Sequence, residues 1–328
     1  MALLEFTHRG IYCPQADCYI DPWVPVRKAL ITHAHADHAT SGHTQYMAVK
    51  DSIPLLKHRL GSFIKALGVG YGEIIHINGV KISFHPAGHI IGSAQIRFEY
   101  QGEIWVVSGD YKTENDGICT PFEPVRCHTF ITESTFGIPL FSWQKQEEIF
   151  EQINTWWRQN QKLGVVSIIS AYALGKAQRI IQNLDSSIGN IYTHSSIENT
   201  HQVLRKQGIL LAKGQKVENH YKYKHFEGSM ILATPLVMGT AWTRRFGIYD
   251  EAFVSGWMNT QSIHHHMIGR KGFTLSDHAD WEGLKKAVRA TGAENIFVTH
   301  GYSELFAKWL RENGYNANPV RTPTSSND

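Results

Sequence analysis

The stretch His33-Ala34-His35-Ala36-Asp37-His38 places four side chains that can bind a metal within six residues. It follows Ala29-Leu30-Ile31-Thr32, an apolar segment typical of a buried strand. Imidazole and carboxylate ligands suit zinc or another divalent first-row metal. Because four ligands so close in sequence cannot all reach one ion comfortably, we expect His33 and His35 to bind one ion and Asp37 and His38 a second. A surface histidine cluster or a purification tag is the alternative, but tags do not alternate histidine with alanine after a strand.

Length and composition set the outer limits. The chain has 328 residues, enough for two domains, and its 42% hydrophobic content allows a substantial core. No apolar run approaches the roughly 18 residues of a membrane-spanning helix, and the first residues do not resemble a secretory signal. Four cysteines without CxxC spacing indicate reduced thiols, so we expect a cytoplasmic protein with no membrane partner. The formal charge of +3 permits an anionic partner without requiring one.

Several other short apolar segments end on a polar residue that can take part in chemistry. Ligands of open α/β sheets gather beyond the carboxyl ends of strands, so we expect these residues to meet in one site. For Asp277 and Asp280 we favour an ordinary helix cap or a satisfied polar group. The segments are 104–107, which runs into Ser108-Gly109-Asp110; 130–132, which runs into Glu133; 272–275, which runs into Ser276-Asp277-His278; and 295–299, which runs into His300.

The middle of the chain has a different pattern. Segments 165–170, 191–193 and 229–233 read as strands, with amphipathic helices after the first two. Alternating strands and helices indicate an α/β fold with a largely parallel sheet. We therefore predict a metal-binding domain formed by residues 1–138 and 272–328, interrupted by an inserted domain at 139–271.

Two metal ions that share a water need six or seven protein ligands and usually a shared carboxylate. His89, in the glycine-flanked stretch Gly88-His89-Ile90-Ile91-Gly92, is the expected fifth ligand, with His85 as its rival. Asp110 is the expected bridging carboxylate, and His300 completes the second ion. Asp21 is expected to accept a hydrogen bond from a ligand imidazole and so orient it.

These residues carry a resemblance. The order Asp21, HAHADH, His89, Asp110 and His300 resembles the metallo-β-lactamase fold, and Glu133-Ser134-Thr135 and Ser276-Asp277-His278 resemble the two further motifs of the β-CASP nucleases. Val254-Ser255-Gly256-Trp257-Met258 is similar to the bacterial ligase-associated DNA exonucleases. The resemblance implies an αββα sandwich with an inserted β-CASP cap, and a DNA-trimming enzyme that acts in repair beside an ATP-dependent DNA ligase and a helicase.

Chemistry and resemblance imply the same mechanism. Two Zn²⁺ or Mn²⁺ ions, one held by His33, His35, His89 and Asp110 and one by Asp37, His38, Asp110 and His300, would activate a water for attack on phosphorus. His278 is the expected acid for the leaving oxygen, with Glu133 accepting its other ring N–H, and Ser276 is expected to donate to a phosphate oxygen. As an alternative, Glu133 caps a helix.

Nucleic-acid binding has weaker support in the sequence, because charged helix residues are usually solvated and tryptophans usually belong to a core. The stretch His264-His265-His266 is an adventitious metal site at most and receives no catalytic role. Trp242 and Trp257 are candidates for stacking on bases. Candidates for phosphate contacts are Lys112, Lys176, Arg179, Arg244, Arg245, Arg270 and Lys271.

Three functions stay open at this stage. The favoured one is a DNA exonuclease. The second is an RNA-processing endonuclease or exonuclease that uses the same site. The third is a hydrolase of small thioesters or lactams, which has no need of an inserted domain or of the Glu133–His278 pair. A non-catalytic binding subunit is disfavoured, because every expected ligand position carries a ligand residue.

Overall fold

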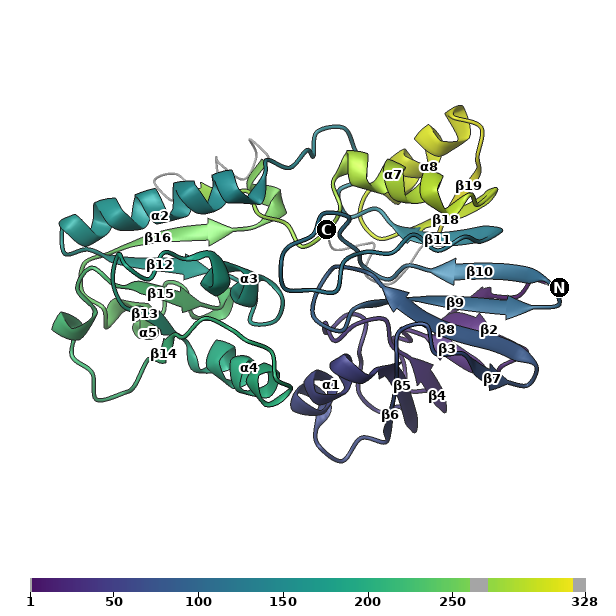
Figure 1. The fold of residues 1–328 in the computed structure, drawn as a ribbon, viewed down its shortest axis with the longest axis horizontal. Helices are drawn as coiled ribbons and strands as arrows, with labels where there is room; N and C mark the ends of the chain where they lie inside the picture. Colours follow the sequence, from purple (N-terminus) through teal and green to yellow (C-terminus); the bar gives the residue numbers. More distant parts are fainter. Residues whose placement is uncertain (1, 260–270, 321–328) are drawn as a thin grey trace. The chain divides into compact units, whose positions relative to one another are not determined.

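The computed structural model describes residues 2–259 and 271–320 (Figure 1). The chain forms two compact units, the first made of Met1–Ser142 with His278–Asp328 and the second of Trp143–Asp277. Sheets and helices occur in both units, so the prediction of an α/β fold with more than one sheet is confirmed. Of the residues singled out in the sequence, Arg270 and the stretch 264–266 lie outside the described residues.

The first unit contains a six-stranded sheet with the strand order β1-β2-β3-β4-β5-β6. The first three strands pair antiparallel, and the pairs from β3 to β6 are parallel. A short 3-10 helix η1 (Lys50–Ser52) and α1 (Ile53–Leu60) connect β5 to β6. The strands are β1 (Glu5–Thr7), β2 (Gly10–Cys13), β3 (Cys18–Ile20), β4 (Lys28–Leu30), β5 (Gln45–Val49) and β6 (Ala66–Val69).

The second sheet of this unit has seven strands in the order β19-β18-β11-β10-β9-β8-β7. The four strands from β19 to β10 are mutually parallel, and those from β10 to β7 alternate in direction. The strands are β7 (Ile75–Ile77), β8 (Val80–Pro86), β9 (Ala94–Tyr100), β10 (Glu103–Val107), β11 (Thr129–Glu133), β18 (Asn295–Thr299) and β19 (Asn316–Pro319).

Alternation along the strands gives the second sheet two buried faces. Trp105 and Val107 of β10 pack in a core shared with the first sheet, whereas Val106 between them packs with helices α7 (Trp281–Thr291) and α8 (Ser303–Glu312). Asp280 caps α7, since its carboxylate accepts a hydrogen bond from the Gly283 N–H at 2.8 Å. The interpretation of Asp280 as a helix cap is therefore confirmed.

The second unit is built on one six-stranded, all-parallel sheet with the order β14-β13-β15-β12-β16-β17. The strands are β12 (Val166–Ser170), β13 (Ile191–Thr193), β14 (Gln215–Lys216), β15 (Met230–Ala233), β16 (Tyr249–Val254) and β17 (Lys271–Phe273). The helices are α2 (Gln146–Lys162), α3 (Lys176–Asn183), α4 (Ser195–Lys206) and α5 (Ala241–Arg244), with 3-10 turns η2 (Tyr223–Phe226), η3 (Pro235–Val237) and η4 (Gly256–Asn259).

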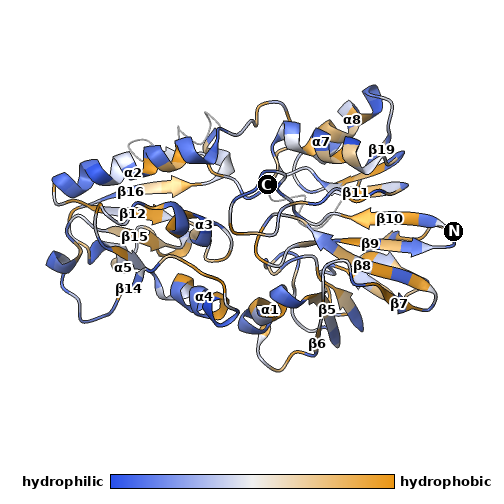
Figure 2. Cartoon of the chain, viewed as in Figure 1, coloured by the Kyte–Doolittle hydropathy of each residue, from blue (hydrophilic) through white to orange (hydrophobic). Residues whose placement is uncertain are grey.

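Both faces of this sheet are covered. Ile169 of β12 packs in the cluster that contains residues of α2 and α3, whereas Ile168 packs in the cluster with Phe226 and Phe246 on the other side. A strand buried on both faces reads as a continuous apolar run, which is why β12 and β15 lack alternation. Figure 2 shows α2 as a mixture of hydrophilic and hydrophobic residues along its length.

All four cysteines are free thiols. Within residues 2–259 and 271–320, no helix has both the length and the apolar character to cross a membrane.

Prediction for the second unit: its stability falls as the pH drops from about 6.5 toward 4. Burial lowers the pKa of His201 from 6.5 to about 4, and Arg205 adds to the effect. Because the folded state resists protonation in this range and the unfolded chain does not, the neutral form stabilises the fold above pH 6.5, by at most about 3 kcal/mol. Urea unfolding of the His201→Gln variant should depend less on pH. The exposed His76→Gln variant is the control, and equal pH slopes for His201→Gln and wild type would contradict the prediction.

Candidate metal centre

The HAHADH stretch forms the loop that leaves the carboxyl end of β4. Backbone hydrogen bonds fix its entry, from the Ile31 N–H to the Met47 carbonyl and from the Ala94 N–H to the Thr32 carbonyl. His33 is fully buried and His38 is 3% exposed, whereas the side chain of Asp37 is 47% exposed. The loop thus presents some of its ligands from inside the fold and Asp37 from its surface.

Asp110 lies where two groups of potential ligands meet. In the first group, ligand atoms of His33, His35, His89 and Asp110 all lie within 4.8 Å of one another, and in the second, those of Asp37, His38 and Asp110 do. The Asp110 Oδ2 atom lies 3.5 Å from His33 Nε2 and 3.7 Å from His89 Nε2, while Oδ1 lies 3.4 Å from His38 Nε2. One carboxylate oxygen therefore faces each group, which is the arrangement of a bridging ligand.

The donor atoms fit a pair of divalent metals. The Nε2 atoms of His33 and His38 are buried and have no hydrogen-bond partner in the described part of the chain. An unpaired buried polar atom costs about 1–3 kcal/mol. Both atoms lie 3.4–3.5 Å from Asp110 oxygens without forming a hydrogen bond, so a metal ion between imidazole and carboxylate would satisfy all of them. Nitrogen and oxygen donors suit Zn²⁺ and Mn²⁺ alike.

Asp21 orients one of these imidazoles. Its Oδ2 atom lies 2.7 Å from His38 Nδ1, and its Oδ1 atom accepts a hydrogen bond from the Thr32 N–H at 2.8 Å. The Thr32 hydroxyl also donates to Asp21. With Nδ1–H of His38 directed at a carboxylate, Nε2 is left as the ligand atom.

Burial and charge act in opposite directions on the site's ionisable groups. Burial holds the pKa of His33 well below its ordinary value, and the neighbouring His38 adds to this. Burial would raise the pKa of Asp110, but His38 outweighs burial and holds it well below the usual range. Conversely, Asp110 and Asp21 outweigh burial at His38, whose pKa is raised. Asp110 is consequently a carboxylate, as a ligand must be.

His300 lies beside the second group without joining it. Its ring stacks on that of His38 at a centroid distance of 5.2 Å, and its backbone is in the left-handed region, with φ of 56°. Among the described residues it contributes no atom to a group within 4.8 Å. Its role as a ligand of the second ion stays a prediction.

Glu133, which is buried, and His278, whose side chain is 21% exposed, form a pair next to the candidate metal ligands. The Nδ1 atom of His278 lies 2.9 Å from Glu133 Oε2, and Glu133 also accepts hydrogen bonds from the Tyr111 N–H and the Thr135 hydroxyl. The carboxylate therefore binds an imidazole instead of capping a helix. Glu133, His278 and Asp110 also form a third potential metal-binding group. The pair thus permits two roles for His278, proton donor and metal ligand.

Arg59 of α1 is a structural support that the sequence did not reveal. Its Nη1 atom donates to the carbonyls of Ala34, His35 and Ala39 at 2.7, 3.3 and 3.4 Å. It thereby fixes the backbone of the HAHADH loop from outside. Nothing in the local sequence around Arg59 indicates this contact.

Ser134 is a second such support, and it ties the Glu133 segment to the His300 segment. Its fully buried hydroxyl is 2.5 Å from the His300 carbonyl and 3.2 Å from the Thr299 carbonyl. Its own carbonyl accepts the Tyr302 N–H. A Cβ on Gly301 would lie 2.5 Å from the Thr135 backbone, so only glycine allows this close approach.

Most of the predicted substrate-binding residues lie in the second unit, whereas Lys112 lies in the first unit, buried and paired with Glu114 at 2.9 Å. Lys176 and Arg179 are buried and pair with Asp277 at 3.4 and 3.5 Å, and Arg179 donates to the Ser276 carbonyl at 2.6 Å. Arg244 is exposed, whereas Arg245 and Trp257 are half-buried. Direct contacts of these residues with substrate stay predictions.

Comparison with known proteins gives partial support for the resemblance. The chain is 27% identical over 323 residues to a protein named probable DNA ligase from Opitutus terrae, which covers 96% of this chain and 30% of that protein. It is 29% identical over 128 residues to Endoribonuclease YSH1 of Saccharomyces cerevisiae, and 28% identical over 123 residues to cleavage and polyadenylation specificity factor subunit 3 of Dictyostelium discoideum. These two matches cover 38% and 36% of this chain. The resemblance to β-CASP nucleases is supported.

The chain spans only 30%, 16% and 15% of the length of these three relatives. No protein-family model matches it. A crystal structure of a protein of unknown function from Enterococcus faecalis V583 has a similar fold, with a TM-score of 0.59 and 11% identity over 90% of this chain and 79% of that one. This structural likeness concerns the fold alone.

Prediction for the metal centre: wild type binds two equivalents of Mn²⁺ or Zn²⁺, and Asp110→Ala loses both, because Asp110 belongs to both groups. His278→Ala keeps two equivalents if His278 is a proton donor. Elemental analysis after dialysis gives the stoichiometry without reference to activity. Loss of an equivalent in His278→Ala would make His278 a ligand, and an Asp110→Ala protein with full metal content would refute the bridging role.

Prediction for Ser134: the Ser134→Ala variant loses the buried hydrogen bond that holds His300, the predicted ligand of the second ion. Of the two bound ions, the one with the lower affinity should therefore bind about tenfold less tightly than in wild type. Titration against a metal-sensitive chelator dye measures this. Ser52→Ala is a matched control, because Ser52 is equally buried in the same unit and its hydroxyl lacks a partner among the described residues. Identical affinities in the two variants would show that Ser134 does not position His300.

Proposed function

We propose that this chain is a metal-dependent phosphodiester hydrolase of the β-CASP type, in which the first unit is a metallo-β-lactamase αββα sandwich and the second is the inserted cap. The observation that carries the proposal is the Glu133–His278 pair beside Asp110 and its two ligand groups. A hydrolase of small thioesters or lactams has use for the metal ligands but none for a glutamate–histidine pair next to them. The endoribonuclease-named relatives add support.

The residues would divide the reaction between them. Two divalent ions, when bound, would supply an activated water and neutralise charge on the phosphate oxygens. His278 donates a proton to the leaving ribose or deoxyribose oxygen, and Glu133 holds the imidazole by accepting its Nδ1–H. Asp21 keeps His38 in the tautomer that ligation requires. Asp37, the most exposed of the ligands, is the one nearest to bulk solvent.

DNA is the substrate that we propose. The relative named DNA ligase matches 96% of the chain, whereas the endoribonuclease-named relatives match 38–49% of it. The region similar to this chain fills less than a third of that ligase-named protein, so it shares a polypeptide with other sequence. We propose on this basis an exonuclease that prepares DNA ends for ligation. The association with a helicase stays a prediction from the resemblance.

RNA cleavage is the second candidate function. One relative is named an endoribonuclease, and another is named a subunit of a cleavage and polyadenylation factor. In either case we propose that Ser276 donates to a phosphate oxygen and that Arg244, Arg245 and Trp257 contact the nucleic acid strand. Lys176 and Arg179 are buried against Asp277. We therefore propose that they hold the Ser276–Asp277 segment in position and do not contact the substrate themselves.

The test is a cleavage assay on single-stranded DNA and RNA of one sequence, labelled at the 5′ or the 3′ end, with Mn²⁺ or Zn²⁺. We expect stepwise shortening of DNA in wild type and none in Asp37→Ala. His278→Ala should lower kcat by about 10²- to 10⁴-fold, the usual contribution of a general acid. The label released first gives the polarity.

Internal cuts in RNA with DNA intact would replace the DNA proposal with RNA processing. If neither is cleaved by protein that holds two metals, the nuclease proposal is wrong and the small-molecule hydrolase takes its place.

A further inference from the structure

A pocket of about 380 Å³ opens at one side of the first unit, and none of the candidate metal ligands lines it. Its walls come from β4, β5 and β6 of the first sheet, with Ile77 of β7 from the second. The strands β6 and β7 are the last strands of their sheets. The pocket therefore lies where the core between the two sheets reaches their free edges.

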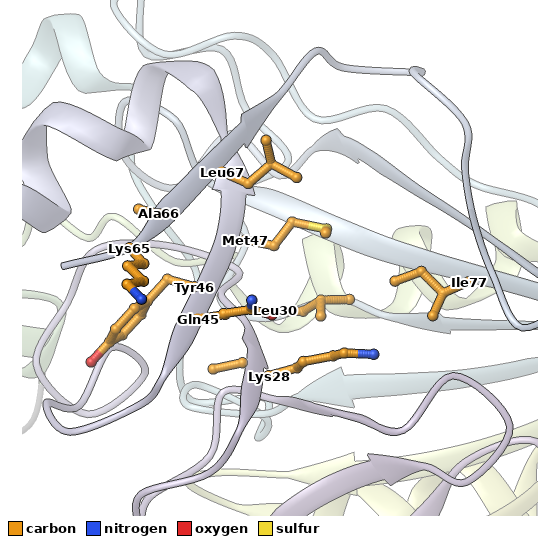
Figure 3. Close-up of a pocket in the computed structure, with 10 residues that line it drawn as sticks. Lys28, Leu30, Gln45, Tyr46, Met47, Lys65, Ala66, Leu67 and Ile77 are labelled. Carbon is orange, nitrogen blue, oxygen red and sulfur yellow. The ribbon is translucent and has the colours of Figure 1, made fainter.

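An apolar row leads from the core into this pocket. Leu30, Met47 and Leu67 are register partners across β4, β5 and β6. Leu30 is 1% exposed, Met47 is half-buried and Leu67 is 55% exposed. Figure 3 shows the three side chains in succession, with Ile77 across from them. The hydrophobic core thus continues to the surface instead of ending under a polar cover.

Residues that precede the two edge strands add exposed apolar surface. Phe63, just before β6, is 84% exposed, and Ile74, just before β7, is 57% exposed. Single exposed apolar residues need no explanation, but several in one short segment beside an apolar pocket mark an interaction site. An edge strand also presents unpaired backbone groups that an extended peptide can pair with.

The charge of the residues that line the pocket indicates what kind of partner can bind there. The charged residues that line the pocket are Lys28 and Lys65, and none of its lining residues is acidic. A second copy of this chain would bring like charges together, which disfavours self-association. An extended segment with alternating apolar and acidic residues satisfies both the pocket and the lysines.

We propose that this pocket is a docking site for such a segment of a partner protein, added along β6 with an apolar side chain between Met47, Leu67 and Ile77. The proposal does not depend on the reaction catalysed at the metal centre.

The test uses a fluorescein-labelled heptapeptide of alternating leucine and aspartate and its leucine–lysine counterpart, with fluorescence anisotropy and the methyl resonance of Met47 as readouts. Wild type should bind the acidic peptide and shift the Met47 resonance. Leu67→Asp should weaken this binding about tenfold or more, as truncation of a central apolar anchor does. The double variant Lys28→Glu, Lys65→Glu should lose the acidic peptide and gain the basic one.

Matched controls separate docking from general attraction to a cationic protein. Leu210→Asp changes a leucine that is 91% exposed in the second unit, and Lys222→Glu with Lys224→Glu removes two exposed lysines there. Both should bind the acidic peptide like wild type. The proposal is overturned if these controls weaken binding as much as the pocket variants do, if the Met47 resonance does not move, or if wild type is a dimer that Leu67→Asp dissociates.

Discussion

The carboxylate of Asp110 must be charged although it is nearly buried, and the candidate site is organised around that requirement. Removing a carboxylate from water is costly unless partners surround it. His33, His38 and His89 supply those partners, and two divalent ions between the groups would supply stronger ones. The close approach of the Asp110 segment to the Thr32 segment depends on Gly109. Its backbone has φ of 56°, and a Cβ at this position would lie 2.6 Å from the Thr32 side chain. Any larger residue there would separate Asp110 from the HAHADH loop.

Strand pairing brings together ligands that are far apart in sequence. Val107 of β10 is in register with Ile131 of β11, and Glu133 at the end of β11 is in register with Thr299 of β18. The carboxyl ends of three adjacent parallel strands therefore deliver Asp110, Glu133 and His300 to one edge. The whole second unit lies between β11 and β18 in sequence, yet this pairing is uninterrupted. The strands of the second unit form a sheet of their own, so this pairing stays within the first unit.

Much of this could be predicted from the sequence because the information is local. Each strand ending, and the loop of alternating ligands, is a short pattern with a direct physical meaning, and the alternating strands and helices of 165–233 indicate the α/β insertion. The two residues that support the site, Arg59 and Ser134, could not be predicted in this way. Arg59 reaches the HAHADH loop from about twenty residues away, and Ser134 binds a carbonyl 166 residues distant, so neither contact has a local signature. In sequence, Lys176 and Arg179 are typical of a solvated helix face, but both are buried beside Asp277, which is about 100 residues away, and Arg179 also bonds Gln146 and the Ser276 carbonyl.

The boundary between the two units falls at the proposed proton donor. Asp277, the last residue of the second unit, is held by Lys176 and Arg179 of α3, while the next residue, His278, is held by Glu133 of the first unit. On its other side, the Ala279 N–H donates to the Tyr111 carbonyl and Asp280 caps α7, so His278 cannot move without straining one of these anchors. The Asp277–His278 peptide bond thus joins the second unit, where the proposed substrate-binding residues lie, to the proposed proton donor of the first unit.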